Sequence, residues 1–328
     1  MPVRTLSVFN DDQFNQANDL LAAKVSTMLG RKMEEGDWDF VYCHAKSIPH
    51  SGWSNLNIDI NHNGLGVEHK MLRITKCGPI LEQCGTTKMH PAGTRSIRIP
   101  SEDDPNKAMK NILNQYNELI DQRSNSVREN SSDNSADMRI GWLLWKDALD
   151  EFIYFEEAMI KPNANHFFAQ WHETPARGTR KASKSLWIFN KETGQKRYSV
   201  TTEAGAKIQP YFDVPTPDDS NLYYFKVQGN YIDGGLVKIW LTRGTAKYLE
   251  LLIGSLDADD LSDAIDNFQL EIVESAGGQS EADKLAVQIF VKQSSYERLK
   301  SIFPHVSDEF IFQQLAIKLG ENDSEDQT

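Results

Sequence analysis

The feature that most constrains the fold is a pair of short apolar runs, at residues 56–60 and 65–74, on either side of Asn63 and Gly64. Both runs are rich in branched side chains and partly alternate apolar with polar residues, which is the pattern of half-buried strands. An Asn-Gly pair tolerates the positive φ angles of a tight hairpin turn. The segment therefore predicts two antiparallel strands side by side, within a fold that is built on a sheet.

Helical and strand-like patterns alternate around this hairpin. Apolar side chains that recur near a period of 3.6 residues predict helices, and short runs of aromatic and branched residues predict strands. By these patterns we expect helices at 11–31 and from Pro105 to about residue 120, strands at 38–43 and 140–145, a mobile loop at 123–135, and either a strand or a helix at 147–159. This order predicts an α/β fold with a mixed central sheet flanked by helices.

The chain changes character near residue 165. Strand-like runs separated by turn residues continue to about residue 248, so the C-terminal half is expected to be β-rich. Helical spacing returns at 260–267, 281–285 and 308–319, around one more strand-like run. No internal repeat is evident. We expect three regions, at 1–165, 166–319 and 320–328, the last an acidic and disordered tail.

Composition narrows the functional classes. The 328 residues carry a net charge of -12, so a uniformly basic nucleic-acid or membrane surface is excluded, and a polyanionic partner would need a locally basic groove. There is no apolar run of about 18 residues, no secretory pattern at the N-terminus and no phosphate-binding G-x-x-x-x-G-K motif. Three sparse cysteines suit reduced thiols. We expect a cytoplasmic protein with neither a membrane nor a nucleotide partner.

The hairpin also carries three charged residues, Asp59, Glu68 and Lys70. Glu68 and Lys70 are two apart and so share one face of a strand, while Asp59 lies near the end of the neighbouring strand. Two adjacent carboxylates repel each other unless a cation lies between them, and hard oxygen ligands suit Mg²⁺. The ammonium group could then orient an attacking water or offset charge on a phosphodiester. The alternative is an edge hairpin whose charges face water.

These residues, and the order of elements around them, resemble the PD-(D/E)XK nuclease superfamily and type II restriction endonucleases in particular, over about residues 10–160. The resemblance implies that Asp59 and Glu68 bind Mg²⁺, that His69 adds its backbone carbonyl, and that Lys70 assists the water. Ile58 stands where the family name has proline, at a position that varies within the superfamily.

The resemblance implies a Mg²⁺-dependent endonuclease that hydrolyses double-stranded DNA at a specific sequence, with its nuclease core at 1–165. The β-rich region 166–319 would then recognise DNA, form the contacts of a homodimer, or both. Two basic segments contain the residues that we expect to contact DNA: Lys88, Arg95, Arg98, Arg177, Arg180, Lys181 and Lys184.

Two other interpretations remain open. One is a repair, mobile-element or modified-DNA nuclease of the same fold. The other is a non-enzymatic, β-rich interaction protein.

Overall fold

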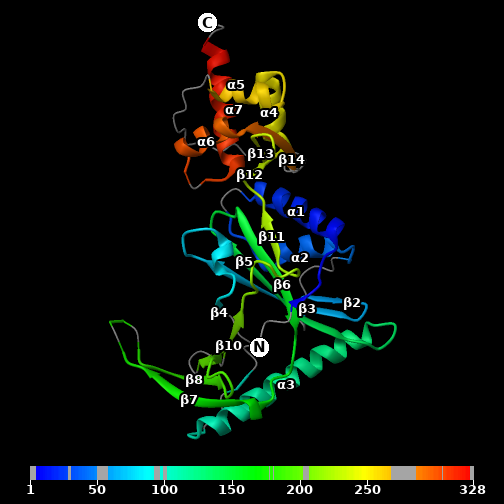
Figure 1. Ribbon diagram of the computed structural model, residues 1–328, viewed down its shortest axis with the longest axis vertical. Coiled ribbons are helices and arrows are strands. Elements are labelled where there is room, and N and C mark those ends of the chain that lie inside the picture. The colour runs from blue at the N-terminus through cyan, green and yellow to red at the C-terminus, as the bar shows by residue number, and fades with distance from the viewer. Residues whose placement is uncertain are drawn as a thin grey trace.

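The computed structural model describes residues 5–28, 31–49, 58–91, 97–98, 102–176, 178–179, 181–201, 207–266, 286–304 and 306–325. Its elements form an elongated molecule of three parts, each built on its own sheet and stacked along the long axis (Figure 1). The central part holds the hairpin, a second sheet lies below it, and a helical lobe lies above it in this view.

The central sheet is mixed. Its elements are β1 (Thr5–Leu6), β2 (Ile60–His62), β3 (Leu65–Ile74), β5 (Asp137–Lys146), β6 (Glu151–Ala158) and β11 (Tyr223–Lys226). The strand order is β1-β6-β5-β3-β2, with β11 also on β6, and only β3 and β5 run parallel. The expected hairpin is confirmed: β2 and β3 pair antiparallel, and Asn63 and Gly64 take φ angles of 43° and 81° in the turn. The segment 147–159 resolves as the strand β6.

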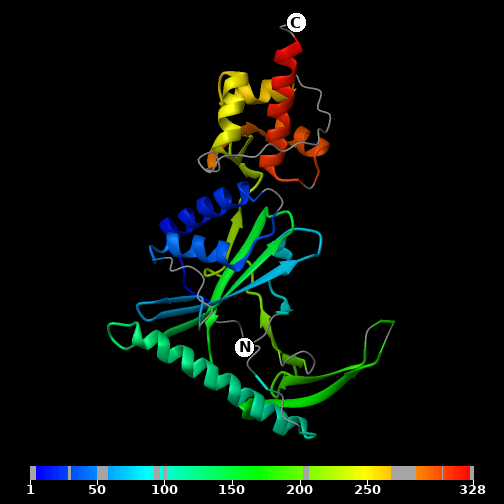
Figure 2. The ribbon, with the colours of Figure 1, turned by 180° about the vertical axis from the view of Figure 1, so that it is seen from behind.

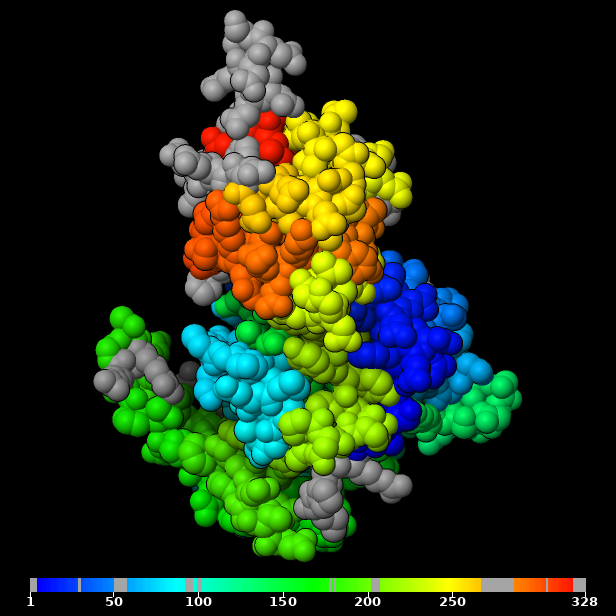
Figure 3. Space-filling model, turned by 45° about the horizontal axis from the view of Figure 1, so that its top comes forward, coloured from blue at the N-terminus to red at the C-terminus, as the bar shows by residue number. Residues whose placement is uncertain are grey.

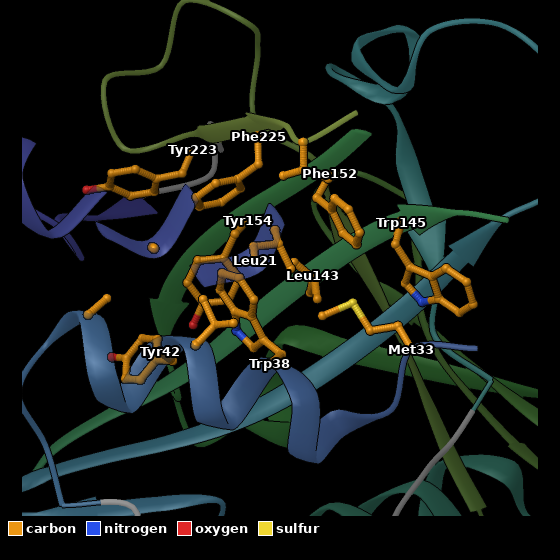
Figure 4. Packing of buried hydrophobic residues seen from close by; sticks show 14 of the residues in the cluster. Leu21, Met33, Trp38, Tyr42, Leu143, Trp145, Phe152, Tyr154, Tyr223 and Phe225 are labelled. Carbon is orange, nitrogen blue, oxygen red and sulfur yellow. The ribbon is translucent and has the colours of Figure 1, made fainter. Parts of the chain in front are cut away.

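Two helices, α1 (Asp11–Ser26) and α2 (Glu35–Ala45), cover one face of this sheet. Between them and the strands lies the aromatic core drawn in Figure 4, with Trp38, Tyr42 and Tyr154 fully buried. The expected strand at 38–43 is wrong. Its aromatic and branched residues lie on α2, where Trp38 and Tyr42 are one turn apart and face the sheet.

The long helix α3 (Pro105–Glu129) runs from the second sheet to the central sheet and joins these two parts (Figure 2). Its start at Pro105 is confirmed, with Asp104 as the N-cap. The expected mobile loop at 123–135 is wrong over its first half, because the helix continues to Glu129 and buries Ser124 and Val127. A polar segment can be helical when only a narrow stripe of it needs to be apolar.

The N-terminal half of α3 packs on the second sheet. This sheet has the order β4-β10-β9-β8-β7. Its strands are β4 (Thr87–Met89), β7 (Phe167–Thr174), β8 (Ser183–Asn190), β9 (Lys196–Thr201) and β10 (Lys207–Asp213), and the short 3-10 helices η1 (Ile80–Gln83) and η2 (Ala164–His166) precede β4 and β7. The β7–β8 hairpin projects from the body of the molecule, as the green arm in Figure 3 shows.

The third part contains β12 (Asn230–Ile232), β13 (Leu236–Thr242), α4 (Arg243–Ile253), α5 (Ala258–Asp266), β14 (Ala286–Lys292), α6 (Gln293–Ile302) and α7 (Asp308–Glu325). The β-rich pattern therefore ends at Thr242, earlier than expected, and α6 was not expected at all. The predicted helix at 281–285 lies outside the described residues. The backbone of α7 is helical to Glu325, within the stretch expected to be a tail.

This lobe consists of two repeated units, and the sequence pattern did not predict this repeat. The unit β13-α4-α5 and the unit β14-α6-α7 align without a gap at an offset of 50 residues. The two strands pair antiparallel about Ile239 and Ile289, which are themselves equivalent in the repeat. Helix α5 packs on β14 and α7 packs on β13, so the units exchange their second helices about a pseudo-twofold axis. Equivalent positions of the lobe's hydrophobic cluster, all buried except the partly buried Val287, are Val237 and Val287, Ile239 and Ile289, Leu249 and Leu299, Leu261 and Ile311, and Ile265 and Leu315.

The fold class is as expected, an α/β protein with a mixed sheet flanked by helices and a β-rich C-terminal half. The sheets do not separate at residue 165, however. Strand β11, from the second half, pairs with β6 of the central sheet, and β4, from the first half, pairs with β10 of the second sheet.

Candidate active site

The hairpin places Asp59 beside Glu68. Ile60 pairs with Val67, so continuing the register by one residue puts Asp59 opposite Glu68. Strand β2 begins at Ile60, one residue after Asp59. The Asp59 carboxylate accepts a hydrogen bond of 2.6 Å from the backbone N–H of His69. A side chain thus satisfies an amide at the point where strand pairing stops.

Glu68 and Lys70 lie on the same face of β3, as alternation requires. Lys70 Nζ is 2.5 Å from Glu68 Oε1, and the two side chains are 24% and 14% exposed. The three predicted groups, Asp59, Glu68 and Lys70, therefore lie together in a partly enclosed site.

The electrostatics agree with this placement. Burial and the charge of Glu68 raise the pKa of Asp59 to about 6, against the opposing charges of His69 and Lys70. Two carboxylates in one enclosed space share this cost, and a cation between them would remove it. The local demand is therefore for additional positive charge.

The ring of His69 points to the opposite face of β3 and is fully buried. Its Nδ1 is 2.5 Å from Asp39 and its Nε2 is 3.1 Å from Tyr154 Oη. Tyr154 donates its single hydroxyl proton to Glu156, which is paired with Arg139, so both ring nitrogens of His69 are donors. Burial opposes the charged ring, but the hydrogen bond and charge of Asp39 outweigh it and raise the pKa of His69. The ring therefore packs on the face of β3 opposite the site. Only the backbone carbonyl of His69, and not its ring, remains a candidate metal ligand.

Two further charged residues reach the site, and the sequence patterns missed both. Arg123, on α3, contacts Glu68 at 3.2 Å from within the segment expected to be a mobile loop. Glu35, in the first turn of α2, lies close enough to interact with Lys70 and Glu68. Burial of its carboxyl, reinforced by Asp39 and Glu68 and opposed by Lys70, raises the pKa of Glu35.

A helical signal for Glu35 was present. Trp38, Val41, Tyr42 and Ala45 recur at the spacing of one helix face, and all four are buried. Ile120 and Val127 are both buried and lie seven residues apart on α3. The buried stripe of the helix therefore continues through the polar run that contains Arg123.

The residues present fit Mg²⁺ only as a two-carboxylate site. Over the described ranges, no group of three or more His, Cys, Asp or Glu side chains is arranged to hold a metal ion. Mg²⁺ is nevertheless commonly held by one or two carboxylates, with water and substrate phosphate in its other positions. Asp59 and Glu68 match that minimal set.

The predicted DNA-contacting residues do not form one cluster. Lys88, on β4, lies at one edge of the second sheet and donates to Gln83, whereas Lys181 and Lys184 are exposed near the β7–β8 turn at the other edge. Lys184 Nζ lies 4.4 Å from the centre of the Trp171 ring. Arg98 is exposed, with its backbone hydrogen-bonded to Gln115 of α3, and Arg95, Arg177 and Arg180 lie outside the described residues.

Comparisons with protein families, with curated proteins and with solved structures find no match to this chain.

The three cysteines are free thiols, as expected. Among the described helices, none is long and apolar enough to cross a membrane.

Proposed function

We propose that this protein is a Mg²⁺-dependent nuclease of the PD-(D/E)XK kind, which hydrolyses phosphodiester bonds. More particularly, we propose a type II restriction endonuclease that acts in the cytoplasm and cuts double-stranded DNA at a specific sequence. The observation that carries the proposal is the juxtaposition of Asp59, Glu68 and Lys70 at one end of the β2–β3 hairpin.

Each of these side chains has a task in direct hydrolysis. Asp59 and Glu68 would hold Mg²⁺, which supplies Lewis-acid polarisation of the phosphoryl group. Lys70 Nζ, held by Glu68, can donate to and orient the attacking water. The water oxygen bonds to phosphorus as the bond to the leaving oxygen breaks. The proton of the water passes to solvent and the leaving oxygen takes up a proton from solvent, so no covalent enzyme intermediate is needed.

The distribution of charge is compatible with a DNA substrate. Residues 229–328 contain 18 acidic and eight basic side chains, so they hold most of the net negative charge of the chain. Residues 1–228, which include the site and the second sheet, are close to neutral, with 29 acidic and 27 basic side chains. The overall charge therefore gives no argument against DNA contact by the first two parts.

Cleavage of both strands needs two such sites. A symmetric homodimer on a palindromic target would supply them, and the second sheet, with exposed Lys181 and Lys184, is our candidate for DNA recognition.

The test is a cleavage assay with purified protein and phage DNA, in buffers with Mg²⁺, with Ca²⁺ and with EDTA. We expect a reproducible band pattern with Mg²⁺ alone. Asp59→Asn and Glu68→Gln should abolish cleavage because the metal ligands are lost. Lys70→Met should slow it by about 100-fold or more, the usual contribution of a positioned proton donor or acceptor.

Asp121→Asn and Lys76→Met are matched controls, because both side chains are more than half exposed and lie outside the site. They should cleave like the wild type. A smear without discrete ends would favour a repair or mobile-element nuclease, and cleavage confined to methylated DNA would favour a modified-DNA nuclease. Full activity in a folded Asp59→Asn variant would reject the proposed site.

A further inference from the structure

Glu68 is contacted by two cations that come from different elements. Lys70 reaches it from the same strand, and Arg123 reaches it from α3, with NH1 3.2 Å from Oε2 and NH2 3.4 Å from Oε1. The guanidinium thus spans both oxygens of the carboxylate. Its side chain is 22% exposed, so the pair that it forms with Glu68 is not fully enclosed.

The position of Arg123 is set by a rigid helix. Ile120, Ser124 and Val127, which flank it on α3, are all buried. Val127 lies so close to β3 that a Cβ on Gly66 would come within 2.6 Å of its Cγ2 atom. The helix therefore rests directly on the catalytic strand, and the guanidinium is brought to the site without an ordering step.

A guanidinium suits this place because its planar fork matches carboxylate and phosphate oxygens equally well. Asp59, Glu68 and Glu35 together bring more negative than positive charge to the site, even with Lys70 and Arg123 present. A phosphodiester that enters such a site needs cations that can turn toward it.

We propose that Arg123 is a catalytic residue of this site, which exchanges its contact with Glu68 for one with the scissile phosphodiester and stabilises the charge that develops on its oxygens. This inference rests on the proposed function. The chemistry is hydrolysis as above: Arg123 keeps its protons and supplies charge and hydrogen bonds only.

The first test compares Arg123→Gln and Arg123→Lys with Arg128→Gln, in single-turnover cleavage across a range of Mg²⁺ concentrations. Arg128 is the matched control because it is exposed on the same helix and its guanidinium donates to exposed Asn125 at 2.9 Å. We expect Arg123→Gln to lower the rate at saturating Mg²⁺ by about 100-fold, as loss of one transition-state donor does in other enzymes. Arg123→Lys should retain part of the wild-type rate. Arg128→Gln should cleave at the full wild-type rate.

A counter-ion that only neutralised Glu68 would behave differently. Its removal would free the carboxylate, so half-saturation would occur at a lower Mg²⁺ concentration while the saturating rate stayed at the wild-type value. That result would overturn the proposal for Arg123 and leave the proposed function standing. A wild-type protein without nuclease activity would reject both.

The second test does not depend on cleavage. Binding of a fluorescent duplex in Ca²⁺ buffer, followed by anisotropy over a range of salt concentrations, reports the number of phosphate contacts. We expect the slope of log affinity against log salt to fall by about 0.9 in Arg123→Gln and to stay unchanged in Arg128→Gln. An unchanged slope in Arg123→Gln would contradict a direct phosphate contact.

Discussion

At the scale of single residues, Asp59 shows how the requirements of the site oppose those of the fold. Its carboxylate accepts a hydrogen bond from the backbone N–H of His69, which stabilises the placement of the side chain. Burial and the charge of Glu68 nevertheless raise the pKa of Asp59 to about 6. The unfolded chain has a pKa of about 3.9 for aspartate. Folding therefore favours the protonated form, and ionisation of Asp59 weakens the metal-free fold.

The sign of the pH dependence follows. The unfolded state binds fewer protons than the native state between about pH 4 and 6, so the Asp59 contribution to stability falls as pH rises through that window. Asp59→Asn keeps an oxygen that can accept the His69 amide and removes the ionisation. We expect the metal-free variant to be more stable than the wild type at pH 8, by at most about 3 kcal/mol, and the difference to shrink toward pH 4.5.

Urea unfolding in EDTA buffers from pH 4.5 to pH 8 measures this difference. A variant that is less stable than the wild type at pH 8 would show that the Asp59 charge stabilises the metal-free fold, contrary to this account.

At the scale of elements, the contact between α3 and β3 connects the site to the second sheet. Gly66 permits it, because an added Cβ would lie 2.6 Å from Val127 Cγ2 and 2.9 Å from Met138 Sδ. The methionine can move, but the valine is fixed on a helix that packs on both the hairpin and the second sheet.

We expect Gly66→Ala to push α3 away from β3 and to lower the free energy of unfolding by about 1–3 kcal/mol, the usual cost of overpacking. Cleavage should fall as well, because Arg123 moves with the helix. The double variant Gly66→Ala/Val127→Ala should regain part of both losses, and a double-mutant cycle measures this coupling.

Gly36→Ala is the control, since nothing lies within 4 Å of its added Cβ on α2. That change should leave stability unchanged or raise it slightly. Simple additivity of Gly66→Ala and Val127→Ala would mean that the two residues do not press on each other.

At the scale of the whole molecule, Gln228 is one of the residues that join the repeated lobe to the central part. The amide of this side chain donates to the carbonyls of Ala148 and Leu149, at 2.8 and 2.9 Å, and its oxygen accepts from Asp308 N at 3.0 Å. One buried side chain therefore satisfies backbone groups from both parts.

Gln228→Ala removes this partner from two buried backbone groups, the Leu149 carbonyl and the Asp308 amide, and from the carbonyl of the exposed residue Ala148. Because an unsatisfied buried group costs about 1–3 kcal/mol, we expect a loss of about 2–4 kcal/mol in unfolding free energy, measured by denaturant titration. The exposed Gln288→Ala on β14 should change stability by less than about 0.5 kcal/mol. Equal effects of the two substitutions would contradict a role of Gln228 in joining the two parts.

Features set by short-range patterns were predictable from the amino-acid sequence. The hairpin, its Asn-Gly turn and the shared face of Glu68 and Lys70 depend on residues within one turn or one strand pair, where backbone geometry leaves few choices. The start of α3 at Pro105 and the strand character of the second half are of the same kind.

Long-range packing decided the rest. The aromatic segment around Trp38 is helical because its buried stripe covers the central sheet, and composition alone favoured a strand. Strand β11 pairs with β6 about 70 residues earlier in the chain, and the pairing of β13 with β14 about equivalent positions defines the repeat. Arg123 reaches Glu68 across 55 residues. Local patterns specify which side chains share a strand or a turn, whereas only the burial of whole faces determines which distant elements meet.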